Sequence, residues 1–273
     1  MWPVGSTAYA EAACVSGSAG VMALVLAETV AGSLVFLWCT PLWGEVKRGY
    51  FTLSGVILCI LALAAWRAAT AGAITGDDAG TWSVRLTLAC MVATLAWTGL
   101  QLLKVNEVAR ILGLLSVLVS IAVLVAMAGT GRQAPPLALF GLLAGAAFLG
   151  SVLDGLLLGH WYLTDRGLSR TPINRATLIM LVAVVVEAVA VIAGGFGGVG
   201  SSEAFNPLLT AGALAPWIAL GMVGATALVA VMVKATLRGE RASAVQSATG
   251  FFYLAVVTAF TAEVAVKVRF LPG

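Results

Sequence analysis

The sequence predicts an all-α fold, in which about eight transmembrane helices form one integral membrane domain over residues 1–273. Apolar residues make up 61% of the chain and charged residues only 10%, whereas a soluble domain carries about 25% charged residues. The apolar residues also gather in runs of roughly 20 or more, which is the length needed to cross a bilayer. The segments between these runs are too short to form a separate soluble domain.

The first half of the chain contains four apolar runs, each ended by a short polar or glycine-rich segment. Residues 44–49 and 104–110 are polar turns with basic side chains, and residues 76–80 form an acidic, glycine-rich loop. Glycine-rich and charged clusters of this kind end apolar helices. The predicted spans are 20–43, 51–72, 84–103 and 109–129.

Four further runs follow the breaker cluster at 131–136. A charged loop at 164–175, a glycine-rich stretch at 194–207 and a basic loop at 234–241 separate them. The predicted spans are 137–162, 176–196, 208–233 and 244–266. A proline inside a span bends it, so Pro216 predicts a kink and a hinge in the seventh span. The last span has an alternative as a re-entrant or surface helix, which would place the C-terminus inside.

The two halves begin in a similar way, which suggests a parallel duplication of four plus four helices. Glu28 and, after it, the basic turn at Lys47 begin the first half. Asp154 and the charged turn at Arg166 occupy comparable places in the second half, although the spacing is inexact.

The basic residues predict the orientation, because cytoplasmic loops are enriched in lysine and arginine. Ten of the 15 lie on one side, namely Lys47, Arg48, Lys104, Arg110, Arg166, Arg170, Arg175, Lys234, Arg238 and Arg241. Five lie on the other side: Arg67, Arg85, Arg132, Lys267 and Arg269. We therefore expect a multi-pass protein of the cell membrane with both termini periplasmic or extracellular.

Several cofactors and partners are excluded by composition. The net charge of +3 provides no basic patch for nucleic acid, so the lipid bilayer and other membrane subunits are the expected partners. His160 is the only histidine, which excludes a bis-histidine haem and a three-histidine zinc site within this chain. The four cysteines form no CxxC pair. We expect no metal and no covalently bound cofactor, and quinone is the one cofactor considered.

Four acidic residues fall inside predicted spans: Glu28, Asp154, Glu187 and Glu263. A charged side chain at the centre of a bilayer costs at least about 2.5–3.5 kcal/mol, so these groups need partners in the bundle interior. Two interpretations remain open, namely an ion path, proton relay or ligand contact, and plain hydrogen bonding between helices. Lys267 follows Glu263 by one helical turn and is its natural partner.

The densest group of chemically active side chains ends the fifth span. It comprises His160, Trp161, Tyr162, Asp165 and Arg166. In one interpretation the aromatic residues form an ordinary interfacial belt and His160 caps the helix. In a second, the group binds a quinone head, for which histidine exchanges protons near neutral pH. In a third, it forms a cytoplasmic gate or docking surface. Gly155 and Gly159 would let another helix or a flat ligand approach.

These features support three hypotheses for function. The first is a membrane subunit of a respiratory or photosynthetic electron-transfer complex, which binds quinone at the cytoplasmic end of the fifth span without being the catalytic subunit. The second is a proton-coupled small-solute transporter that uses Glu28, Asp154 and Glu187 near the middle of the bilayer. The third is a structural membrane scaffold without chemistry of its own. No hydrolytic or paired-carboxylate catalytic arrangement is evident.

Overall fold

A computed structural model describes residues 17–43, 46–72, 78–130, 133–165, 167–195, 214–239 and 243–268. Within these ranges the protein is helical, with one short 3-10 helix, η1 (Thr40–Trp43), and eight long helices that are apolar enough to cross a membrane. This confirms the predicted all-α fold. The helices are α1 (Gly17–Cys39), α2 (Arg48–Gly72), α3 (Asp78–Leu103), α4 (Asn106–Ala128), α5 (Pro135–Thr164), α6 (Thr171–Ala193), α8 (Leu214–Leu237) and α9 (Ser243–Lys267).

Local sequence signals explain several helix ends. Pro135 begins α5 and Pro172 lies in the first turn of α6, where the missing N–H has no acceptor within the helix. Lys104 follows α3 with a φ of 64°, the left-handed conformation that commonly ends a helix. Pro216 is the third residue of the described helix α8, and the residues before Leu214 lie outside the described ranges, so the kink there stays a prediction.

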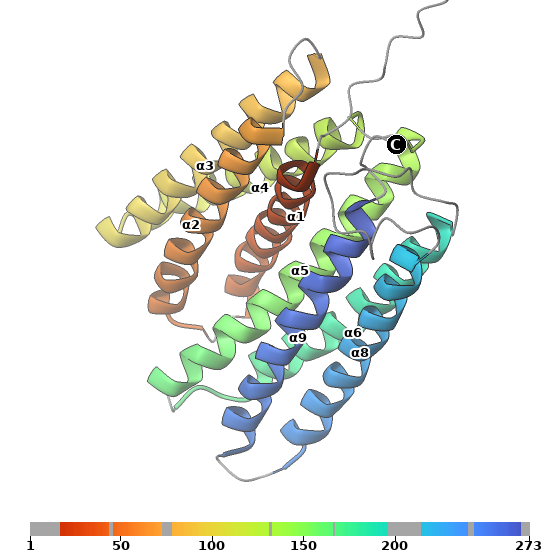
Figure 1. The fold of residues 1–273 in the computed structure, drawn as a ribbon. Coiled ribbons are helices and arrows are strands. Elements are labelled where there is room, and N and C mark those ends of the chain that lie inside the picture. Colours follow the sequence, from red (N-terminus) through yellow and green to blue (C-terminus); the bar gives the residue numbers. More distant parts are fainter. Residues whose placement is uncertain are drawn as a thin grey trace, which may run out of the picture.

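The eight helices form two rings of four (Figure 1). In the first ring α1 packs on α2, α2 on α3, α3 on α4, and α4 on α1. In the second, α5 packs on α6, α6 on α8, α8 on α9, and α9 on α5. This is the division that a duplication of four plus four helices would produce. The rings meet mainly where α1 packs along α5, so these two helices form the centre of the molecule.

Two glycines allow α1 and α5 to cross at backbone contact. A Cβ atom added to Gly32 of α1 would lie 1.7 Å from the carbonyl oxygen of Ala146 on α5. One added to Gly150 of α5 would lie 2.6 Å from the Cα of Gly32. Small residues that permit such close approach are typical of helix pairs in membranes. The crossing fixes how side chains of the two rings face each other.

The outside of the bundle is apolar, as expected of a surface that contacts lipid. Large aliphatic side chains that are more than half exposed occur on six different helices, for example Ile60, Leu95, Ile111, Val185, Leu228 and Val257. The eighth predicted span is α9, a continuous helix of 25 residues. The chain is therefore a multi-pass membrane protein, and the outside location of its termini stays a prediction from the basic loops.

Candidate functional site: buried charges between the two rings

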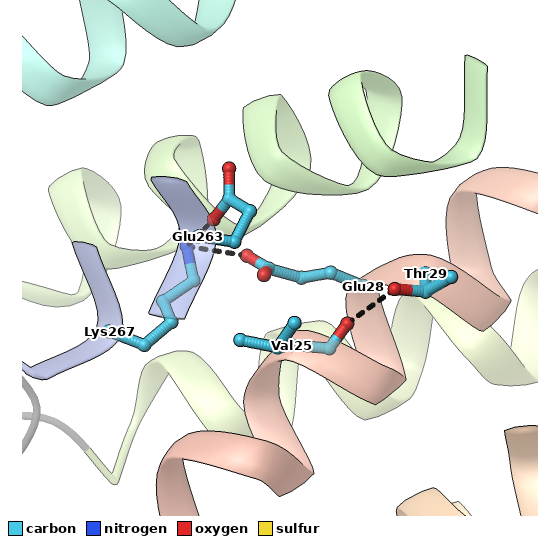
Figure 2. A network of polar contacts seen from close by, with 5 residues as sticks. All are labelled: Val25, Glu28, Thr29, Glu263 and Lys267. Atoms are coloured by element: carbon cyan, nitrogen blue, oxygen red, sulfur yellow. Dashed lines mark hydrogen bonds and ion pairs between the residues drawn. The ribbon is translucent and has the colours of Figure 1, made fainter. Parts of the chain in front are cut away.

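Three fully buried charged side chains meet where α9 faces α1 (Figure 2). The ammonium Nζ of Lys267, the last residue of α9, lies 2.6 Å from Oε1 of Glu28 on α1. The same Nζ lies 3.0 Å from Oε2 of Glu263, one turn earlier in α9. One lysine thus bridges carboxylates from both rings, and no part of the three side chains reaches the surface.

Glu187 of α6 brings a third carboxyl group to the same place. The side chain is buried, and the largest of the charges that act on it is that of Glu263. The charges of Lys267 and Glu28 also act on it. We call Glu28, Glu187, Glu263 and Lys267 the charge cluster. It contains three acids and one base, contributed by three helices.

Gly145 of α5 provides the space for the charge cluster. A Cβ at this position would lie 2.7 Å from Oε1 of Glu28 and 2.9 Å from Oε2 of Glu263. Any larger residue would therefore displace the carboxylates from Lys267. The requirement for glycine here comes from the two acids and not from the backbone conformation.

A small recess connects the charge cluster with one end of the bundle. It has a volume of about 20 Å³ and is lined by Glu187 and Lys267, together with Gln133 and Gly194. Gln133 lies just before α5 and Gly194 just after α6, on the side predicted to face outward. A polar cavity needs roughly 10–15 Å³ to hold one water molecule, so the recess is large enough for a single water beside the charges.

Asp154 does not join the charge cluster but forms a second buried polar pair. It accepts a hydrogen bond from the hydroxyl of Tyr50 on α2, and both side chains are buried. Asp154 follows Gly145 by nine residues on α5, which corresponds to about 14 Å along the helix. Between them, beside Gly150, lies Ser33, whose buried hydroxyl has no hydrogen-bond partner in the part of the chain that the structure describes.

His160 lies on the outside of the bundle at the end of α5, beside a residue that sequence analysis missed. Its ring nitrogens are 3.2 Å from the hydroxyl of Tyr253 on α9, and the two rings meet edge to face. Both side chains are exposed. Since 93 positions separate them in the sequence, only the packing of α9 on α5 reveals the pair.

The neighbours predicted to share a site with His160 have other partners. Trp161 packs against Gly49 of α2, where an added Cβ would lie 2.2 Å from the indole ring. The Tyr162 hydroxyl donates to the carbonyl oxygen of Ser169. The carboxylate of Asp165 lies 2.9 Å from Nζ of Lys47. Arg166 lies outside the residues that the structure describes.

The two glycines beside Asp154 accommodate a helix. An added Cβ on Gly155 would lie 2.1 Å from the ring of Phe252, and one on Gly159 would lie 2.5 Å from the hydroxyl of Thr249. Both contacts come from α9. The sequence left two possible occupants of this space, another helix or a flat ligand. In the structure helix α9 fills it.

The sequence analysis did not predict the contact of Lys267 with Glu28. The predicted pairing with Glu263 is confirmed. The structure adds that this side chain, at the end of α9, is fully buried and also bridges to Glu28. The location of the termini stays a prediction from the basic loops.

The fold and these buried charges together define a multi-pass α-helical membrane protein with a charge cluster between two four-helix rings. None of the protein-family models, curated proteins or solved structures compared with the chain matches it.

Proposed function

We propose that the chain is a proton-coupled transporter of a small solute, in which the charge cluster takes up and releases protons. The supporting observation is that Glu28, Glu187 and Glu263 converge on one lysine. If each acid had its own basic partner, the groups would be neutral and a structural role would suffice. With three acids and one base, two carboxyl groups have no basic partner of their own. These two groups can bind and release protons.

Counting charges gives the proton content of the cluster. One ammonium neutralises one carboxylate, and each further ionised carboxylate in a dry interior costs several kcal/mol. The neutral cluster therefore holds two protons on three carboxyl groups. Because Lys267 contacts both Glu28 and Glu263, loss of a proton from one acid changes the charge that the others experience. Intramembrane acids arranged in this way are typical of proton pathways.

The positions of the polar groups support a path across the interface of the rings. On the predicted outer side the recess, which is large enough for one water molecule, extends to Glu187 and Lys267. Toward the inner side follow the free hydroxyl of Ser33 and then the Asp154–Tyr50 pair. A proton that enters through the recess would bind the cluster and leave through Asp154. Helices α1 and α5, which line this route, also join the rings, so a change in cluster charge acts on their packing.

The proposal is tested by electrical recording from proteoliposomes on a solid-supported membrane. Under a pH gradient, a panel of amino acids, sugars, organic acids and monovalent cations is applied one class at a time. We expect a current that depends on both the gradient and one solute class. Glu28→Gln, which keeps the shape of the side chain, should reduce it at least about tenfold, since general acid–base groups contribute 10²–10⁴-fold where they transfer protons.

Glu107→Gln is the matched control, because Glu107 is an exposed acid in the first turn of α4. It should leave the current unchanged. Folded wild-type protein that gives no solute-dependent current with any class, or equal currents from wild type and Glu28→Gln, would contradict the proposal.

The second candidate is a quinone-binding membrane subunit of a respiratory or photosynthetic redox complex. The favouring observation is the exposed His160–Tyr253 pair, which places an imidazole and a phenol side by side at the end of the bundle. Purification from native membranes with neither quinone nor redox subunits would argue against it, as would unchanged quinol turnover in His160→Ala. If both candidates fail, a scaffold without chemistry is the remaining proposal.

A further inference from the structure

A pocket separate from the charge cluster lies inside the first ring. It has a volume of about 590 Å³ and is lined by all four helices of that ring. It occupies the end where α1 and α3 finish and where α2 and α4 begin, next to the basic turns that are predicted to be cytoplasmic. Its size falls in the range of about 300–1,000 Å³ that is usual for small-molecule sites.

Two arginines, Arg48 and Arg110, lie at the polar end of the pocket. The first of them is engaged in hydrogen bonds within the protein. The guanidinium of Arg48 donates from Nε to the carbonyl oxygen of Gln101 at 2.9 Å and from Nη1 to Oδ1 of Asn106 at 3.0 Å. It thereby caps the last turn of α3. Arg110, in the second turn of α4, is exposed and forms no hydrogen bond or ion pair with any residue in the described ranges. Its charge is available to a ligand.

The remainder of the pocket is apolar and aromatic. Trp38, Phe51 and Trp97 come from three helices and line it together with aliphatic residues. Trp97 is six residues from the end of α3, so the pocket extends about 9 Å into the bundle. A ligand that fills this space therefore has a charged group at the helix ends and an apolar part between the indole rings.

We propose that this pocket binds an anionic phospholipid through its phosphate. Guanidinium groups match phosphate oxygens in geometry and charge, and basic pockets between transmembrane helices on the cytoplasmic side bind anionic head groups. The phosphate contacts Arg110 at the level of the helix ends, and the start of the acyl region lies against Trp38 and Trp97. This inference depends on the pocket alone and is independent of proton coupling.

The test measures binding of short-chain lipids to the purified, delipidated protein by native mass spectrometry. The probes are dihexanoyl phosphatidylglycerol, dihexanoyl phosphatidylcholine and inorganic phosphate. Both lipids carry the phosphate, but the choline cation of phosphatidylcholine is repelled by Arg48 and Arg110. We therefore expect phosphatidylglycerol to bind at least about tenfold more tightly than phosphatidylcholine. Inorganic phosphate, which lacks the apolar part, should not displace the lipid.

Two variants and two matched controls locate the site. Arg110→Gln removes the unpaired charge, and Gly113→Leu fills the pocket, since a Cβ there would lie 3.0 Å from Nε1 of Trp97 and 3.6 Å from Cδ1 of Trp38. Each should weaken phosphatidylglycerol binding at least about tenfold. Lys104→Gln removes a neighbouring exposed charge, and Gly99→Leu adds the same side chain where nothing lies within 4 Å. Both should bind like wild type.

Three results would overturn the inference. Equal affinity for the two lipids would show that charge does not select the ligand. Displacement of the lipid by inorganic phosphate would identify a site for free anions, to which the aromatic residues of the pocket contribute no binding energy. Unchanged binding in both Arg110→Gln and Gly113→Leu would place the lipid elsewhere.

Discussion

Replacement of Lys267 by methionine should lower the free energy of unfolding by about 3–5 kcal/mol, because removing one partner of a buried ion pair leaves an uncompensated charge. The substitution keeps the length of the side chain but leaves Glu28, Glu187 and Glu263 without a cation. The acids must then either bind another proton or separate. Unfolding of the purified protein in mixed micelles, titrated with sodium dodecyl sulfate, measures the effect.

Lys47→Met is the control for this prediction. Lys47 forms a salt bridge of similar length with Asp165, 2.9 Å, but its side chain is 71% exposed. Surface ion pairs contribute only about 0–1 kcal/mol, so this variant should unfold almost as wild type does. Equal stabilities of Lys267→Met and Lys47→Met would show that the buried pair is not formed in the folded protein.

The second large effect is expected from Gly32→Ala at the crossing of α1 and α5. The new methyl carbon would lie 1.7 Å from the carbonyl oxygen of Ala146, and this backbone atom cannot rotate away. The two rings must therefore move apart. Overpacking usually costs 1–3 kcal/mol and occasionally more, and a clash with backbone should cost at least about 3 kcal/mol. The same unfolding titration measures it.

Gly141→Ala provides the matched substitution at a glycine of α5 where an added Cβ meets nothing within 4 Å. We expect it to be neutral or slightly stabilising, since alanine favours a helix over glycine by up to about 1 kcal/mol. A Gly32→Ala variant that is as stable as Gly141→Ala would contradict the close contact between the rings.

The helices were predictable because a bilayer requires long uninterrupted apolar segments. Every predicted span corresponds to a helix, and the deviations occur at the ends. The helix predicted from 176 begins at Thr171, since Pro172 is tolerated in a first turn. The helix predicted from 208 is described from Leu214, and residues 208–213 lie outside the described ranges. Hydropathy locates the apolar core of a helix but not its first polar turn.

The acids of the candidate site were predictable, but their arrangement was not. Glu28 and Glu187 are conspicuous in apolar runs, yet no local pattern shows that α1, α6 and α9 bring them together. Lys267 resembles an ordinary flanking residue because it ends its helix, and only tertiary packing directs its side chain inward. Long-range pairs of this kind leave no trace in a single sequence.

The run His160-Trp161-Tyr162 shows the opposite difficulty. Its residues are adjacent in the sequence and chemically suggestive, but successive side chains on an α-helix point about 100° apart. His160 accordingly lies beside α9, whereas Trp161 lies against α2. Chemically active residues that are adjacent on a helix therefore share a site less often than residues spaced by one full turn, which lie on the same face.

The most direct measurement of the central claim is infrared difference spectroscopy of the reconstituted protein during exchange from H2O to D2O. If the charge cluster holds protons that water can reach, the band of protonated carboxyl groups will be present at neutral pH and will shift on exchange. The band should lose intensity in Glu28→Gln and keep it in Glu107→Gln, which alters an exposed acid. A band that is absent, or that is identical in wild type and Glu28→Gln, would show that the cluster does not store exchangeable protons.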